Sequence, residues 1–373
     1  MNYLIKAPEK TYVEIYLPAS KSISNRVLLL NALCSHPKEI KNISVCDDTD
    51  VMIKALHDEG GEINIGAAGT AMRFLTAYLS LKKGSRTITG TERMKNRPVK
   101  LLVDALRSLG AQIEYVEKEN FPPLHIEGQT LVGGEVSLDG GVSSQYISAL
   151  LMIAPLMTNG LRLHLTGHVI SRPYINLTIR LMRKFGVIVF EEGQCLTVPP
   201  QQYSPVEDFM VEADWSAASY WYEMVTFCEN ENAQVSLPGL SPDSMQGDAA
   251  IVELFDKLGV KTTFTCSGAI LARKERAVDP PFTFDFVSMP DMAQTAAVAC
   301  IMLGIPFKFT GLQSLRIKET DRLAALQTEL GKLGYPLTIR DGNALEWNGE
   351  RSDAAQSPVI ATYDDHRMAM AFA

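Results

Sequence analysis

Residues 103–115, VDALRSLGAQIEY, combine an amphipathic helix pattern that ends in a leucine and Gly110 with the alternating pattern of a short strand. The same order of helix, apolar residue, glycine and strand returns as IRLMRKFGVIVFE, IVELFDKLGVKTTFT and LQTELGKLGYPLTIR. The four glycines, Gly110, Gly186, Gly259 and Gly334, lie 76, 73 and 75 residues apart, which indicates an internal structural repeat. Each is expected just past the end of a helix, where glycine adopts the left-handed conformation at low cost.

A fifth copy, VMIKALHDEGGEINI at residues 51–65, ends at Gly60–Gly61, about 50 residues before Gly110. Its unit is therefore expected to be shortened by about 25 residues relative to the regular spacing.

A second helix pattern recurs between these copies and is apolar or small on every side, which predicts buried helices. Its copies start at intervals of 48, 74, 72, 75 and 75 residues, near Ser22, Thr70, Ser144, Ser216, Asp291 and His366. The two series together predict six βα-rich units, three in each of two domains. At the fourth start, the Ser216 hydroxyl is expected to be an ordinary N-cap.

The sixth unit is expected to be incomplete. In units two to five the buried helix begins 40 to 43 residues before the glycine, whereas the sequence stops at Ala373, 7 residues after His366. About 40 residues of this unit are absent from the sequence, either because the chain is truncated or because its tail is not recorded.

Composition excludes several classes of protein. Of 373 residues, 46% are hydrophobic and 21% charged, as in an ordinary globular protein, and the net charge of −8 argues against a nucleic-acid binder. The N-terminus has no apolar signal-peptide core, and the apolar stretches are too short to span a bilayer. The six cysteines are scattered without a CxxC pair, so that neither a zinc site nor a disulfide framework is expected. We expect a cytoplasmic protein without a metal.

Cations nevertheless collect at the predicted starts of buried helices, for example in PASKSISNR at residues 18–26. A helix N-terminus already has partial positive charge, so Lys21, Arg26, Arg73 and Arg367 are misplaced there unless an anion lies between them. RMKNRP at residues 93–98 adds three more cations in a loop. The pattern predicts a pocket for a small, highly charged anion.

These stretches together resemble the 5-enolpyruvylshikimate-3-phosphate synthase family over nearly the whole chain. The motifs appear in order as SKSISNR, AAGTAMRF, MKNRPV, SSQYISALL, SRPYI, VEADWSAASY, PDMAQTAA, LRIKETDR and DDHRMAMAF. The resemblance implies an α/β (α+β) fold of two domains with inverse α/β architecture, each a threefold repeat of βαβαββ units with buried parallel helices, and a ligand site between the domains. The expected domains are residues 21–212 and residues 1–20 plus 213–373.

The resemblance also implies an activity, the transfer of the enolpyruvyl group of phosphoenolpyruvate to the 5-hydroxyl of shikimate 3-phosphate with release of phosphate. This 3-phosphoshikimate 1-carboxyvinyltransferase reaction belongs to aromatic amino-acid (chorismate) biosynthesis. It implies small-molecule substrates as the only partners, no nucleic acid, no membrane, no metal or organic cofactor, and a monomer.

Site residues follow from the same resemblance, motif by motif. Shikimate 3-phosphate is expected to bind Lys21, Ser22, Arg26, Ser143, Ser144, Gln145, Ser171, Tyr174, Asp291 and Lys318. Phosphoenolpyruvate is expected to bind Lys21, Gly69, Arg97, Gln145, Arg322 and Arg367. The expected catalytic residues are Asp291, at the 5-hydroxyl, together with Glu319, Lys21 and His366. The direction of each proton transfer is left open.

The sequence departs from the family pattern at several points. Ala67 and Ser314 stand where asparagine is usual, the segment before Gly66 is shortened, and a further C-terminal lysine of the family has no counterpart. Two alternative functions stay open: the sister enolpyruvyl transferase that acts on UDP-N-acetylglucosamine, and a non-catalytic paralogue that binds small anions. The sister enzyme typically uses a loop cysteine, and this chain has no cysteine between Cys46 and Cys195.

Overall fold

The computed structural model describes residues 12–58, 60–141, 143–230 and 232–373. The chain divides into two compact units, which we call the N-unit, Ala19–Glu212, and the C-unit, Met1–Pro18 plus Ala213–Ala373. The first boundary lies two residues before the one expected from the sequence. Whether these units are independent folding domains stays a prediction.

The N-unit contains two four-stranded sheets of identical strand order, β2-β3-β5-β4 and β6-β7-β9-β8. Their strands are β2 (Glu62–Asn64), β3 (Gly84–Thr89), β4 (Gln112–Tyr115), β5 (Leu124–Gly128), β6 (Gly134–Asp139), β7 (Leu161–Thr166), β8 (Phe190–Glu192) and β9 (Cys195–Val198). The helices are α1 (Lys21–Ala32), α2 (Asp47–His57), α3 (Gly69–Leu81), α4 (Glu92–Lys95), α5 (Lys100–Ser108), α6 (Ser144–Ile153), the 3-10 turn η1 (Ala154–Leu156) and α7 (Arg172–Lys184).

The C-unit repeats this arrangement with sheets β1-β10-β12-β11 and β13-β14-β16-β15. Its strands are β1 (Tyr12–Glu14), β10 (Gln234–Pro238), β11 (Val260–Phe264), β12 (Gly268–Arg273), β13 (Phe282–Asp285), β14 (Phe307–Thr310), β15 (Thr338–Arg340) and β16 (Ala344–Trp347). Its helices are α8 (Trp215–Phe227), η2 (Gly247–Ala250), α9 (Ile251–Lys257), η3 (Pro290–Met292), α10 (Ala293–Met302), η4 (Gln313–Ile317), α11 (Arg322–Lys332) and α12 (His366–Ala371).

All four sheets are built in the same way. The first strand pairs in parallel with the second, as β6 does with β7, and the last two strands form an antiparallel hairpin that pairs with the second. A buried helix connects the parallel strands because a parallel crossover needs a long connection. In the C-unit, β1 lies before the whole N-unit in sequence, yet Val13 is paired with Val235. The predicted α/β fold built of βαβαββ units is confirmed.

The expectation of six units is only partly met, since four units in the described residues have a complete sheet. The first unit consists of α1 and α2 and has an isolated bridge, Lys41 to Met210, instead of a sheet. Its predicted strand, EINI, is β2, which pairs with β3 and so opens the next sheet. Of the expected sixth unit, the described residues include α12.

The four regular glycines behave as predicted. Gly110, Gly186, Gly259 and Gly334 have φ values of 104°, 82°, 98° and 84°. After Gly110, the Ala111 amide donates back to the Leu106 carbonyl at 2.9 Å, the closing bond of a Schellman motif. The fifth copy does have a helix, α2, followed by a strand, β2, but α2 ends at His57 and Asp58 is already extended, so that Gly60–Gly61 does not end the helix.

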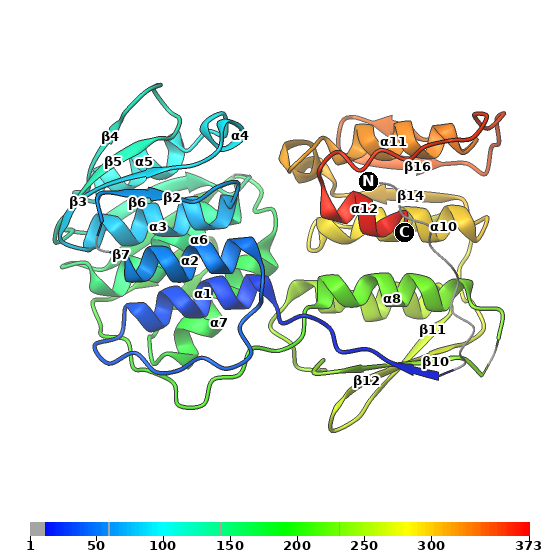
Figure 1. Cartoon of the computed structure of the whole chain (residues 1–373), viewed down its shortest axis with the longest axis horizontal. Coiled ribbons are helices and arrows are strands. Elements are labelled where there is room, and N and C mark those ends of the chain that lie inside the picture. The colour runs from blue at the N-terminus through cyan, green and yellow to red at the C-terminus, as the bar shows by residue number, and fades with distance from the viewer. Residues whose placement is uncertain (1–11, 59, 142, 231) are drawn as a thin grey trace. The chain divides into compact units, whose positions relative to one another are not determined.

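The second helix pattern does give buried helices. Every residue of α6 except Gln145 is buried, and so are nine of the ten residues of α10. α3 packs on α6 in the N-unit, and α10 packs on α8 and α12 in the C-unit. Figure 1 shows α8 and α10 between the sheet that contains β10 and β12 and the sheet that contains β14 and β16. This packing brings the starts of α8, α10 and α12 together at one end of the C-unit.

Candidate functional site

The expected site residues fall into two groups, one in each unit. The N-unit group contains Lys21, Ser22, Arg26, Gly69, Arg97, Ser143, Ser144, Gln145, Ser171 and Tyr174. The C-unit group contains Asp291, Lys318, Glu319, Arg322, His366 and Arg367.

Arg26 is a buried cation of the N-unit without a carboxylate partner. Its side chain is 3% exposed, and its Nε donates to the Thr178 hydroxyl at 2.8 Å. Its Nη1 donates to the Ser22 carbonyl at 2.9 Å, and the guanidinium lies 5.3 Å from the centre of the Phe74 ring. No described carboxylate lies within ion-pair distance of it. Burial lowers the pKa of Arg26 to about 10, because the charged form has lost its water.

Two further cations of the N-unit, Arg97 and Arg73, lie close to Gly69 at the start of α3. A Cβ on Gly69 would lie 2.6 Å from Nη1 of Arg97 and 3.1 Å from Nη1 of Arg73. Arg73 is 4% exposed, and its Nε has no partner among the described residues. Burial, and then the like charge of Arg97, lower the pKa of Arg73. Two guanidiniums at a helix start without a described carboxylate favour a bound anion there, and a side chain at position 69 would displace the end of Arg97. The sequence drew attention to Arg73, but the resemblance did not assign it a role.

The hydroxyl and amide residues of the N-unit link further helix starts. Ser143 caps α6, and the Gln145 side chain donates to Thr70 at the start of α3 at 3.2 Å. Ser171 precedes α7 in a left-handed conformation with φ 54°, and the nearby Tyr174 carbonyl accepts from Arg26 at 3.5 Å. Lys21, the first residue of α1, forms a 3.6 Å ion pair with Asp48.

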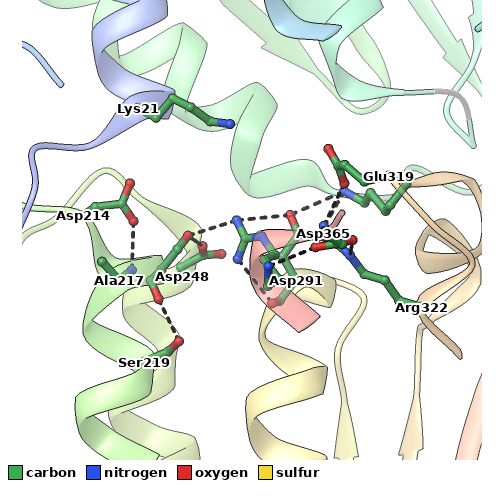
Figure 2. A network of polar contacts seen from close by, with 12 residues as sticks. Lys21, Asp214, Ala217, Ser219, Asp248, Asp291, Glu319, Arg322 and Asp365 are labelled. Carbon is green, nitrogen blue, oxygen red and sulfur yellow. Dashed lines mark hydrogen bonds and ion pairs between the residues drawn. The ribbon is translucent and has the colours of Figure 1, made fainter. Parts of the chain in front are cut away.

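Arg322 is the centre of the C-unit group and is 1% exposed (Figure 2). It donates to three carboxylates, from Nη1 to Asp291, from Nη2 to Glu319 and from Nε to Asp365, each at 2.7 Å. An anion that binds to Arg322 must therefore compete with carboxylates already in place.

Asp291 is surrounded by cations. Lys318 lies 3.2 Å and Arg367 3.6 Å from its carboxylate, in addition to Arg322. Burial by itself raises the pKa of Asp291, but Lys318, Arg367 and Arg322 outweigh it and hold the pKa well below its usual range. Asp291 is therefore ionised and can accept a hydrogen bond throughout the physiological pH range.

The pKa of Glu319 is also set by opposing effects. Burial raises its pKa, whereas Arg322 lowers it, and the result lies below the ordinary glutamate value. His366, the first residue of α12, is exposed, and Asp365 caps that helix by accepting from the Arg367 amide at 2.9 Å. Asp365 thus fixes both Arg322 and the backbone of Arg367.

Ser216 and Asp248 were missed as site residues. The N-cap of α8 is Asp214, which accepts from the Ala217 amide at 3.1 Å, so the expectation that Ser216 is the cap was wrong. The Ser216 hydroxyl instead accepts from Arg367 at 3.1 Å and donates to the Asp248 carboxylate. The repeat spacing placed Ser216 at a helix start, but no local signal in the sequence relates it to Asp248.

Within residues 12–373, apart from the three positions not described, no group of three or more His, Cys, Asp or Glu side chains is placed to hold a metal ion. The helices that the structure describes include none with the length and apolarity needed to cross a membrane.

Comparison with known proteins identifies the relatives of the chain. The family model described as EPSP synthase (3-phosphoshikimate 1-carboxyvinyltransferase) matches residues 5–64 and 57–373. A 3-phosphoshikimate 1-carboxyvinyltransferase from Bacteroides fragilis is 54% identical over 374 residues, covering 100% of this chain and 90% of that protein. One from Photobacterium profundum is 38% identical over 388 residues, covering 96% and 88%. A solved structure of EPSP synthase from Acinetobacter baumannii has a TM-score of 0.75 at 21% identity, covering 97% of this chain and 88% of that one.

Proposed function

The chain belongs to the EPSP synthase (3-phosphoshikimate 1-carboxyvinyltransferase) family, and from this premise we propose how its residues bind the two substrates and move protons between them. The chain is a transferase of carboxyvinyl groups. It joins the enolpyruvyl group of phosphoenolpyruvate to the 5-hydroxyl of shikimate 3-phosphate and releases phosphate.

One observation supports the binding part of the proposal above the others. Arg26, Arg73 and Arg97 have no described carboxylate within ion-pair distance, although the protein as a whole is acidic. A buried cation without a counter-ion is unfavourable, and a bound phosphate or carboxylate removes that cost. Both substrates carry such groups, and each charge-assisted hydrogen bond to them contributes about 1.5–3 kcal/mol.

We assign the residues to the two substrates as the family resemblance implies. Shikimate 3-phosphate binds Lys21, Ser22, Arg26, Ser143, Ser144, Gln145, Ser171, Tyr174, Asp291 and Lys318. Phosphoenolpyruvate binds Lys21, Gly69, Arg97, Gln145, Arg322 and Arg367, and the contact of Gly69 with two guanidiniums adds Arg73 to this set.

The addition step of the reaction needs two proton movements, and the elimination step needs a third. The 5-hydroxyl loses a proton as its oxygen attacks C2 of phosphoenolpyruvate, and C3 gains a proton to become a methyl group. The tetrahedral intermediate then loses the C3 proton again, and the C2–O bond to phosphate breaks. We propose that Asp291, ionised and held by three cations, accepts the hydroxyl proton. We propose that Glu319 and Lys21 exchange the proton at C3 and that His366 assists there.

The test is a phosphate-release assay that requires both substrates. Asp291→Asn should still bind shikimate 3-phosphate but lose turnover by about 10²–10⁴-fold, because the amide cannot accept the proton. Asp256→Asn is the matched control, since Asp256 is an exposed aspartate paired with Lys274 at 2.6 Å. Near-normal turnover of the Asp291 variant would contradict its role as the base.

The same assay separates the alternatives. Phosphate release with UDP-N-acetylglucosamine in place of shikimate 3-phosphate would support the sister activity, which the names of the relatives do not favour. Anion binding without any release would support a non-catalytic paralogue. We also propose that the protein acts as a cytoplasmic monomer.

A further inference from the structure

Arg367 is supported by an acceptor on each side of its guanidinium. Its Nη2 donates to the Ser216 hydroxyl at 3.1 Å, and its Nη1 donates to the backbone carbonyl of Asp291 at 3.3 Å. Its side chain is 14% exposed, so that it is largely enclosed by these neighbours. The orientation of the guanidinium plane therefore depends on where the Ser216 oxygen lies and which way its proton points.

Asp248 decides the direction of that proton. The Ser216 hydroxyl donates to Oδ2 of Asp248, a side chain that is 5% exposed and has no hydrogen-bond partner on Oδ1 among the described residues. A hydroxyl has a single proton. When it is donated to Asp248, only lone pairs remain on the side of Arg367, and Ser216 is fixed as an acceptor.

Gln246 links the segment that contains Asp248 to the start of α8, where Ser216 lies. Its side chain accepts from the Trp215 amide at 3.2 Å and donates to the Ala213 carbonyl at 2.8 Å. Because Gln246 lies two residues before Asp248, these bonds fix the start of η2 against the start of α8. A buried carboxylate held against a helix start in this way is costly and is not needed to cap the helix, which Asp214 already does.

We propose that Ser216 and Asp248 are positioning residues that orient the Arg367 guanidinium for phosphoenolpyruvate. Neither residue touches the substrate in this proposal, and both act through Arg367. The inference rests on the proposed function, in which Arg367 binds phosphoenolpyruvate, and adds to it the specific support on which that contact depends.

The first test varies Ser216 alone. Ser216→Ala removes the acceptor and should raise KM for phosphoenolpyruvate about tenfold while KM for shikimate 3-phosphate stays within about twofold. Ser216→Thr keeps the hydroxyl and should restore KM to near the original value. Ser219→Ala is the matched control, because Ser219 lies one turn further along α8, donates to the Ser216 carbonyl at 2.7 Å and does not contact Arg367.

The second test uses pH. Burial raises the pKa of Asp248 to about 6, against the opposing effect of Arg367; Asp291 and Asp214 also raise it, and the bond from Ser216 lowers it. Asp248→Asn should reduce kcat/KM for phosphoenolpyruvate about tenfold at pH 7.5. At pH 5, where Asp248 of the unchanged protein is itself neutral, the two proteins should agree within about twofold. Because both proteins are compared at the same pH, the effect of substrate ionisation cancels in the ratio of their kcat/KM values.

Each outcome bears on one proposal. The positioning role would be overturned if KM for phosphoenolpyruvate were unchanged in Ser216→Ala, or if it were as high in Ser216→Thr as in Ser216→Ala. It would also be overturned if the ratio of kcat/KM between the unchanged protein and Asp248→Asn did not depend on pH. Tighter binding in Asp248→Asn would overturn it too, because Asp248 would then act only by reducing the local positive charge. Equilibrium binding of phosphoenolpyruvate to the same variants gives a reading that does not require turnover. Loss of binding in Ser216→Ala without turnover in the unchanged protein supports the positioning role and contradicts the proposed function.

Discussion

Buried charged side chains are the clearest functional signal at the level of single residues. Arg26 is 3% exposed without a described carboxylate partner, whereas Arg322 is 1% exposed and contacts three. In the first arrangement the cation has no described carboxylate to balance its charge, whereas in the second a single cation contacts three carboxylates. The same residue type thus serves opposite electrostatic purposes in the two units.

Asp248 allows a prediction about stability at this scale. Its pKa is raised from 3.8 in the unfolded chain to about 6 in the folded protein, so its contribution to stability is present below pH 4 and is lost as pH rises towards 6. Asp248→Asn avoids this loss and should raise the free energy of unfolding at pH 7.5 by up to about 3 kcal/mol.

Urea unfolding at pH 4 and pH 7.5 measures this difference. The two proteins should be equally stable at pH 4 and differ at pH 7.5, while Asp256→Asn should show no such gain. A variant that is less stable at pH 7.5 would contradict the prediction. A gain in stability together with weaker phosphoenolpyruvate binding would identify Asp248 as a residue retained for function.

At the level of elements, the segment before α12 depends on one glutamate of α11. Residues 351–365 contain no helix or strand, yet they end at the start of α12, where His366 and Arg367 lie. Glu329, with no exposed area, accepts from the Tyr363 hydroxyl at 2.6 Å and from the Ala361 amide at 3.0 Å. Lys332 completes the contact through the same carboxylate and the Val359 carbonyl.

Removal of this contact should loosen the segment. Glu329→Ala leaves the Ala361 amide and the Tyr363 hydroxyl without the carboxylate that accepts from them, so amide hydrogen exchange over residues 355–365 should become at least about tenfold faster. Turnover should fall with it, because Arg367 follows the segment directly. Glu253→Ala on the corresponding helix α9 is the control, since that side chain is 76% exposed. Unchanged exchange would show that the segment is held by other contacts.

At the level of the whole molecule, an acidic protein binds anionic substrates through local cations. A ligand that binds only the folded state stabilises it by about 2.7 kcal/mol at one hundred times its Kd, and we expect this of shikimate 3-phosphate bound at Arg26. For a chain of this size that corresponds to a rise in Tm of about 3 °C.

Arg26→Met should abolish this rise in Tm, while Tm without ligand should stay unchanged or increase because a buried cation has been removed. Arg180→Met, on the exposed face of α7, should keep the full response. Differential scanning calorimetry measures both. A full response of the Arg26 variant would show that Arg26 does not bind this substrate.

The sequence predicted most of the architecture because the relevant signals are local. The glycines at the helix ends and the all-apolar buried helices depend on neighbours within one or two turns, and the period near 75 residues is the recurrence of these local patterns along the chain. The two errors in the repeat, at Gly60–Gly61 and at EINI, lie where the shortened unit breaks the period. The family resemblance predicted the activity, and the comparisons confirm it.

By itself, then, the sequence determined the repeat, the positions of the helix starts and the gathering of cations at them. Only the tertiary structure decided which partners those cations have. Arg322 contacts Asp291 and Asp365, 31 and 43 residues away, and Arg367 contacts Ser216 across 151 residues. The physical reason is that a local pattern specifies which face of a helix is buried, whereas the meeting of two helix starts depends on how whole elements pack.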